Sequence, residues 1–155
     1  MRGHADAVVG VTRRHGTTAA VALLRDRTIL EVRRTRTPDA GLAIGSALRL
    51  AADYGARCIV TDRDVPPADN GPATVRVLPL SLAKQSLLGT STRTHDALFA
   101  HVLKELPGLE RFVTLLKVDG RVAAMKRRQT VILLAAAFAL ADLSPSSHPL
   151  TTHPL

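Results

Sequence analysis

Residues 7–36 read AVVGVTRRHGTTAAVALLRDRTILEVRRTR. This stretch holds three short apolar runs, and the first two are followed by the breaker-rich RRHG and by the charged RDR. Short apolar runs bounded by turn residues are typical of strands. Because the connections are so short, the spacing predicts an antiparallel meander of three strands, at 7–12, 17–24 and 28–36.

After this meander the hydrophobic period changes to that of a helix. Apolar residues recur at helical spacing between Asp39, the expected N-cap, and Gly55, the expected C-cap. Strands are predicted at 57–62 and 74–79, and we expect both to run parallel to the first strand. The rest is predicted to be helical apart from loops at 65–73, 89–92 and 107–108, with a last helix from about Gly120 or Arg121 to Asp142.

The length of 155 residues predicts one domain, which we place at 1–143. The tail at 144–155 holds three prolines and two histidines and no apolar period, so we expect it to be disordered. No internal repeat is found in the sequence.

The charge balance points to a polyanionic partner. Lys and Arg number 21 against 13 Asp and Glu, which gives a net charge of +8. Hydrophobic residues make up 46% of the chain, so it is not a disordered basic tail. A folded domain with this excess of cations predicts nucleic acid as the first candidate partner.

Other features exclude classes of protein. The single cysteine, Cys58, excludes an internal disulfide and a structural zinc site built on cysteines. The aromatic content of 3% argues against a base-stacking platform for single strands. The longest apolar run, 131–141, is shorter than the roughly 20 residues of a membrane span. Residues 1–6 lack the apolar region of a signal peptide, so we expect a cytoplasmic protein without a membrane partner.

The predicted order of elements resembles the ribonuclease H-like fold, and its helical second half resembles the RuvC-like branch, the Holliday-junction resolvases. The likeness covers residues 7–142. Its most suggestive part is LSLAKQSLLG at 80–89, in which a helix carries Lys84 and reaches a glycine before the polar basic loop at 90–94. The resemblance implies an α/β fold with a five-stranded mixed sheet, three strands antiparallel and the others parallel, flanked by helices.

The same resemblance implies two divalent metal ions held by acids on the first strand, at the end of the fourth strand and in the first half of the last helix. Thr12 stands in the first of these positions, and Asp6 precedes the strand. Asp62 fills the second position, with Asp64 two residues on. Asp142 is the one acid of the predicted last helix and lies at its far end. We therefore interpret Thr12, Asp62 and Asp142 as remnants of a catalytic centre, with Asp62 as the one candidate metal ligand.

The basic residues form a second candidate site. Four of them open the predicted last helix, where cations oppose the helix dipole, so bound phosphates would compensate them. The alternative is a solvated helix face. Such contacts position a nucleic-acid backbone and do not read bases. The predicted nucleic-acid-binding residues are Arg13, Arg14, Lys84, Arg93, Arg121, Lys126, Arg127 and Arg128. His95, with Asp96, is expected to open a helix and is assigned no catalytic role.

These observations favour a RuvC-like protein that binds branched or duplex DNA, lacks a complete two-metal nuclease centre, needs no cofactor and acts as a dimer or an accessory subunit. One alternative is an active endodeoxyribonuclease that cuts Holliday junctions with magnesium or manganese at Asp62, Asp64 and Asp142. Another is a structural subunit whose apolar last helix packs against a second copy or a protein partner. Residues 13–18 also resemble the phosphate turn of actin-like ATPases, but the chain is too short for the two lobes of that fold.

Overall fold

The computed structural model describes residues 7–63, 73–90, 92–113, 115–118, 121–124 and 127–143, with the backbone alone at 115–118, 121–124 and 127–128. Several predictions from the sequence lie outside this part of the chain. They concern the loop at 65–72, the tail at 144–155, and the residues Asp6, Asp64 and Lys126.

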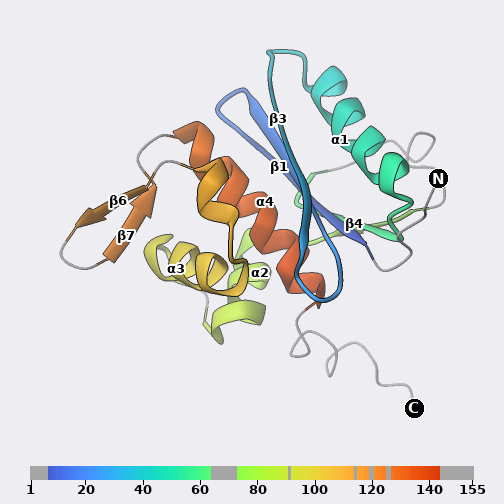
Figure 1. The fold of residues 1–155 in the computed structure, drawn as a ribbon. Helices are drawn as coiled ribbons and strands as arrows, with labels where there is room; N and C mark the ends of the chain where they lie inside the picture. Colours follow the sequence, from blue (N-terminus) through green and yellow to red (C-terminus); the bar gives the residue numbers. More distant parts are fainter. Residues whose placement is uncertain are drawn as a thin grey trace.

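A five-stranded mixed sheet forms the centre of the molecule (Figure 1). Its strand order is β3-β2-β1-β4-β5, with β1 antiparallel to β2, β2 antiparallel to β3, and β1, β4 and β5 parallel. The predicted meander and the predicted parallel strands are confirmed. The strands are β1 (Val8–Arg14), β2 (Thr17–Leu23), β3 (Ile29–Arg36), β4 (Cys58–Thr61) and β5 (Thr74–Val77).

Helices cover both faces of this sheet (Figure 1). Helix α1 (Ala40–Tyr54) packs on one face, against β2 and β3 most of all. Helix α4 (Arg127–Leu143) crosses β1, β2 and β4 on the other face. Two shorter helices, α2 (Leu80–Leu88) and α3 (Asp96–Glu105), pack against α4. A short 3₁₀ turn follows at Leu109–Phe112.

Helix α1 begins and ends where the sequence predicts. The side chain of Asp39 accepts a hydrogen bond from the backbone N–H of Leu42 at 3.1 Å. At the other end, Gly55 adopts a left-handed conformation with φ of 62°, which a residue without Cβ takes at little cost. The predicted N-cap and C-cap are therefore confirmed.

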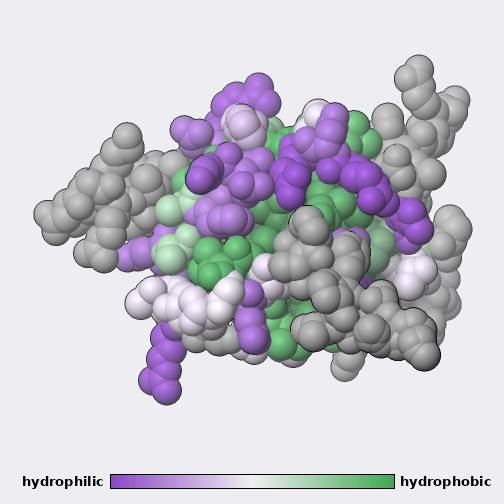
Figure 2. All heavy atoms as spheres, turned by 90° about the horizontal axis from the view of Figure 1, so that it is seen from below, coloured by the Kyte–Doolittle hydropathy of each residue, from purple (hydrophilic) through white to green (hydrophobic). Residues whose placement is uncertain are grey.

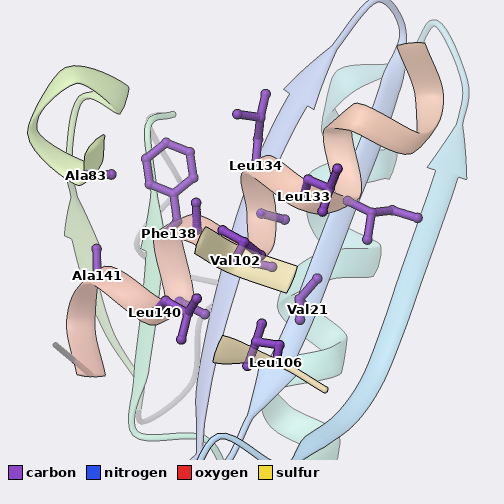
Figure 3. Close-up of a cluster of buried hydrophobic side chains, with 14 of the residues drawn as sticks. Val21, Ala83, Val102, Leu106, Leu133, Leu134, Phe138, Leu140 and Ala141 are labelled. Atoms are coloured by element: carbon purple, nitrogen blue, oxygen red, sulfur yellow. The ribbon is translucent and has the colours of Figure 1, made fainter. Parts of the chain in front are cut away.

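The larger hydrophobic core lies between the sheet and helices α2 to α4. Figure 3 shows Phe138 of α4 beside Ala83 of α2, with Val102 of α3 and the next residue after α3, Leu106, in the same cluster. All residues of 131–141 are buried, none more than 3% exposed. The apolar run expected to contact a partner is thus covered by this chain's own sheet and helices.

Gly10 sets the distance between β1 and α4. A Cβ atom at this position would lie 2.0 Å from the carbonyl oxygen of Ala135 and 2.7 Å from the backbone nitrogen of Ala139. Only glycine lets the two backbones approach this closely. The small residues of α4 and Gly10 together place the helix directly on the central strand.

The prediction of a last helix beginning near residue 120 is wrong. Residues Leu115–Val118 and Arg121–Ala124 form the antiparallel strands β6 and β7, and α4 begins only at Arg127. The sequence carries a signal for this hairpin, because Asp-Gly is a common two-residue hairpin turn and Asp119-Gly120 separates the short runs 115–118 and 121–124. The hairpin extends from the body of the molecule beside α3 (Figure 1).

The surface seen from below is mixed in character. Hydrophilic side chains gather in a band along one side of this view, and hydrophobic side chains show between them and elsewhere (Figure 2). Among the described helices, none combines the length and the apolar character that a membrane crossing requires.

Candidate nucleic-acid interface

The carboxyl ends of β1 and β4 bring Thr12 and Asp62 together. The two strands are parallel neighbours, with Val11 opposite Thr61, so the next residue of each strand lies at the same edge of the sheet. Thr12 is completely buried, and its hydroxyl donates a hydrogen bond to Oδ1 of Asp62 at 2.9 Å. Thr12 also shares its face of β1 with Gly10, and it therefore points toward the α4 side of the sheet.

Arg14 completes this cluster. One guanidinium nitrogen donates to Oγ1 of Thr12 at 2.8 Å, and the other donates to Oδ2 of Asp62 at 2.8 Å. The Asp62 side chain is 14% exposed and that of Arg14 is 27% exposed, so the ion pair is largely withdrawn from water. Both carboxylate oxygens of Asp62 accept hydrogen bonds from protein donors, and the Arg14 guanidinium contacts both the hydroxyl and the carboxylate.

Arg63 adds a second cation beside the same carboxylate. Its Nε lies 3.7 Å from Oδ1 of Asp62, and its guanidinium also donates to the backbone carbonyl of Arg13. Arg63 is considerably more exposed than Arg14. The sequence did not single out this residue, although its position directly after the acid of a strand end marks it as part of the same edge.

Arg13 belongs to a different environment from Arg14, although the sequence grouped the two. Alternate residues of a strand point to opposite faces. The Arg13 guanidinium donates to the Thr18 hydroxyl at 3.0 Å and to the Thr37 carbonyl at 2.7 Å. Arg13 therefore ties the ends of the three meander strands together, on the other face of β1 from Arg14, and its role in nucleic-acid binding stays a prediction.

Lys84 lies on α2, and His95 is the N-cap residue of α3. Lys84 is only 5% exposed, and its Nζ donates to the carbonyl of Thr92 at 2.8 Å. Burial lowers the pKa of Lys84. Burial also lowers the pKa of His95, and the charges of Lys84 and Arg14 lower it further, whereas Asp96 raises it. Both cations therefore disfavour the protonated form of His95.

Asp142 does not join this cluster. It lies at the end of α4, where Arg76 donates to its Oδ1 at 2.9 Å and the thiol of Cys58 lies 3.9 Å from the same oxygen. Cys58 begins β4, whereas Asp62 follows its end. Four strand residues span about 13 Å, so Asp142 and Asp62 occupy opposite ends of β4. Among the described residues, no group of three or more His, Cys, Asp and Glu side chains has the arrangement of a metal site.

Fewer contacts are described for the remaining predicted cations. Arg93 is exposed in the loop before α3. Arg121 lies on β7, and it does not open the last helix as predicted. Arg127 and Arg128 form the first turn of α4, so two cations, not four, oppose the helix dipole within the described helix. The side chains of these last three residues are outside the described part of the structure.

Comparison with solved structures places this fold among known proteins. Thermus thermophilus RuvC superposes with a TM-score of 0.58 at 11% identity, over 87% of this chain and 92% of that one. RuvC of the same organism in complex with a Holliday junction substrate gives a TM-score of 0.60 at 13% identity, over 91% and 94%. The large terminase nuclease of the thermophilic phage G20c gives 0.55 at 16% identity, over 87% and 81%. No protein-family model and no curated protein matches the sequence.

These likenesses confirm the ribonuclease H-like fold and the resemblance to RuvC. They extend over nearly the whole described chain, so one fold accounts for the sheet, α1 and the helices packed on α4. At such low identity they establish the fold alone, and what this chain does must be argued from its own residues.

Proposed function

We propose that this protein binds the phosphate backbone of branched or duplex DNA at the carboxyl ends of β1 and β4, and that it does so without a two-metal nuclease centre. One observation carries the proposal. The guanidinium of Arg14 bridges Thr12 and Asp62, at the edge where the RuvC resemblance implies metal ions. A fixed cation there attracts phosphate groups directly. The solved RuvC complex with a Holliday junction supports DNA as the partner class.

The described side chains at this edge do not fit a pair of magnesium ions. Magnesium prefers carboxylate oxygens in octahedral geometry, and two ions about 4 Å apart need several of them. Thr12 is neutral, both oxygens of Asp62 already accept hydrogen bonds, and Asp142 is at the other end of β4. Residues 127–135, the first half of α4, contain no acid. We therefore derive no metal-dependent step for this protein.

The electrostatics of the edge favour an anion instead. Arg14 and Arg63 are the two cations beside Asp62, and Lys84 is a further, buried cation on α2. The cations are not fully compensated, and two of them are held in low-dielectric surroundings where charge interactions are stronger than in water. Arginine donates two parallel hydrogen bonds, which matches the geometry of a phosphate. Asp62 would hold Arg14 in place while other guanidinium N–H groups face the ligand.

The proposal is tested by measuring the affinity for fluorescein-labelled duplex and four-way-junction DNA in a chelating buffer. We expect micromolar or tighter binding by the native chain. Arg14→Gln should weaken binding several-fold because it removes a positioned cation. Asp62→Asn should leave binding unchanged or tighten it, because it removes the one carboxylate of the cluster. Arg49→Gln, on the exposed surface of α1, is the matched control and should have no effect.

The same proteins distinguish the alternative of a metal-dependent nuclease. Incubation of the junction with magnesium or manganese should leave it intact. Cleavage that disappears in Asp62→Asn would contradict the proposal and favour an active resolvase. Absence of binding to either DNA at micromolar protein would contradict it as well.

A further inference from the structure

His95 is a histidine for which the fold itself provides no role. It is the N-cap residue of α3, yet its side chain makes no capping hydrogen bond. The ring stacks on Phe99 with centroids 5.2 Å apart and an interplanar angle of 21°. Phe99 is itself buried, so the imidazole is held in a fixed orientation. Nδ1 of His95 is enclosed and has no hydrogen-bond partner among the described residues. A buried polar atom without a partner indicates an absent ligand, ion or water.

The surroundings of His95 are cationic. Lys84 on α2 is almost completely buried, and its ammonium carries three N–H donors, one of which is directed at the Thr92 carbonyl. Thr92 is only three residues before His95, so this bond holds the loop that leads into α3 against α2. Arg14 of β1 acts on His95 from the sheet side, and Asp96 is the acid whose charge opposes the two cations. Burial and the two cations hold the pKa of His95 below its ordinary value, so they favour the neutral ring in the free protein.

We propose that one phosphate group of a nucleic acid binds beside His95, Lys84 and Arg14, and that His95 takes up a proton from solvent when it binds. This inference rests on the proposed function. It adds His95 as a residue that contacts the phosphate, and it couples DNA binding to the uptake of a proton. Phosphate oxygens accept hydrogen bonds from the lysine ammonium, the arginine guanidinium and the imidazolium. The phosphate compensates the positive charges that disfavour protonation of His95. Once protonated, the imidazolium becomes the third positive group that contacts the phosphate.

The sign of the pH dependence follows from this arrangement. Bound phosphate raises the pKa of His95 relative to the free protein. At a pH between the pKa of His95 in the free protein and its pKa in the complex, the complex therefore holds more protons than its separate components. Affinity therefore rises as the pH falls through this interval. A pKa that is one unit higher in the complex corresponds to about tenfold tighter binding once His95 is protonated.

The test is the affinity for a short fluorescein-labelled DNA duplex at constant ionic strength, measured between about pH 8 and about pH 5.5. The native chain is expected to bind about tenfold more tightly at the acid end. His95→Gln should lose most of this pH dependence and keep the affinity seen at the alkaline end. His15→Gln is the matched control, because His15 lies exposed at the β1–β2 turn. It should keep the full pH dependence of the native chain.

A second readout does not depend on any variant. The pKa of the His95 ring is followed by NMR in the native chain, with and without the duplex, and it should rise when DNA is bound. A pKa that is unchanged by DNA, or a pH profile that is identical in the native chain and in His95→Gln, would overturn the inference. Salt-sensitive binding would then still support the proposed function. If no DNA binds at any pH, the proposed function itself fails.

Discussion

At the scale of single residues, the site depends on which side chains share a face of β1. Thr12 and Arg14 are two residues apart, and strand alternation places both on the same face. The sequence was sufficient to predict that Thr12 and Asp62 end strands that run parallel. It was not sufficient to predict the bridge made by Arg14, because this bridge depends on a partner 48 residues away. The hydrogen bonds of Arg13 could not be predicted for the same reason, since its acceptors belong to Thr18 and Thr37.

A carboxylate in place of Thr12 should give this edge an affinity for metal ions that, under the proposed function, the native side chains do not have. We expect Thr12→Asp to destabilise the protein by about 3 kcal/mol, because a second charge is buried opposite Asp62. Magnesium should raise the melting temperature of this variant and leave that of the native chain unchanged. Thermal unfolding with and without magnesium measures both effects. A melting temperature of the native chain that rises with magnesium would show that the present side chains already bind the ion.

Cys58 should be an unreactive thiol. Burial, followed by the charge of Asp142, raises its pKa from 9.0 to about 11. The thiolate is the nucleophile, so two pKa units correspond to about 100-fold slower alkylation near pH 8 than for an unperturbed thiol. Iodoacetamide labelling followed by mass spectrometry checks this, with the urea-unfolded chain as the control. Equal labelling rates for the folded and unfolded chain would contradict the placement of Cys58 beside Asp142.

At the scale of elements, most helices and strands followed from local patterns. The meander was marked by short turns, and α1 by its two caps. The hairpin of β6 and β7 was missed because its second strand runs into the α4 sequence without a proline or a glycine between them. Only four residues long, each strand is also too short for alternation to outweigh the helical propensity of the alanines around it.

The contact between β1 and α4 gives a prediction at this scale. Gly10→Ala should destabilise the protein by about 3 kcal/mol or prevent folding, because the new Cβ collides with the backbone of α4 at Ala135 and Ala139. Gly45→Ala is the matched control within α1. Nothing lies within 4 Å of a Cβ at that position, so helix propensity should make the change neutral or stabilising by up to about 1 kcal/mol. Urea unfolding compares the two variants, and equal stabilities would contradict the close packing.

At the scale of the whole molecule, the order of elements was enough to predict the ribonuclease H-like fold. Function could not be read from the fold in the same way, because one fold hosts many activities. The net charge of +8 indicated a polyanion, but it did not indicate where the anion binds. The structure divides the cations into two kinds. Arg13 and Arg76 bond acceptors away from Asp62, whereas Arg14 and Arg63 lie beside Asp62 at the carboxyl ends of β1 and β4.

The decisive measurement is the DNA affinity of the full chain as a function of salt, in a buffer that chelates metal ions. If Arg14, Arg63 and Lys84 each contact a phosphate, log K should fall with log salt at a slope of about −3, because each contact contributes about −0.9. Arg14→Gln should make this slope shallower by about one contact. Binding that is absent at micromolar protein, or that does not change with salt, would contradict the proposal that this edge of the sheet holds a nucleic-acid backbone.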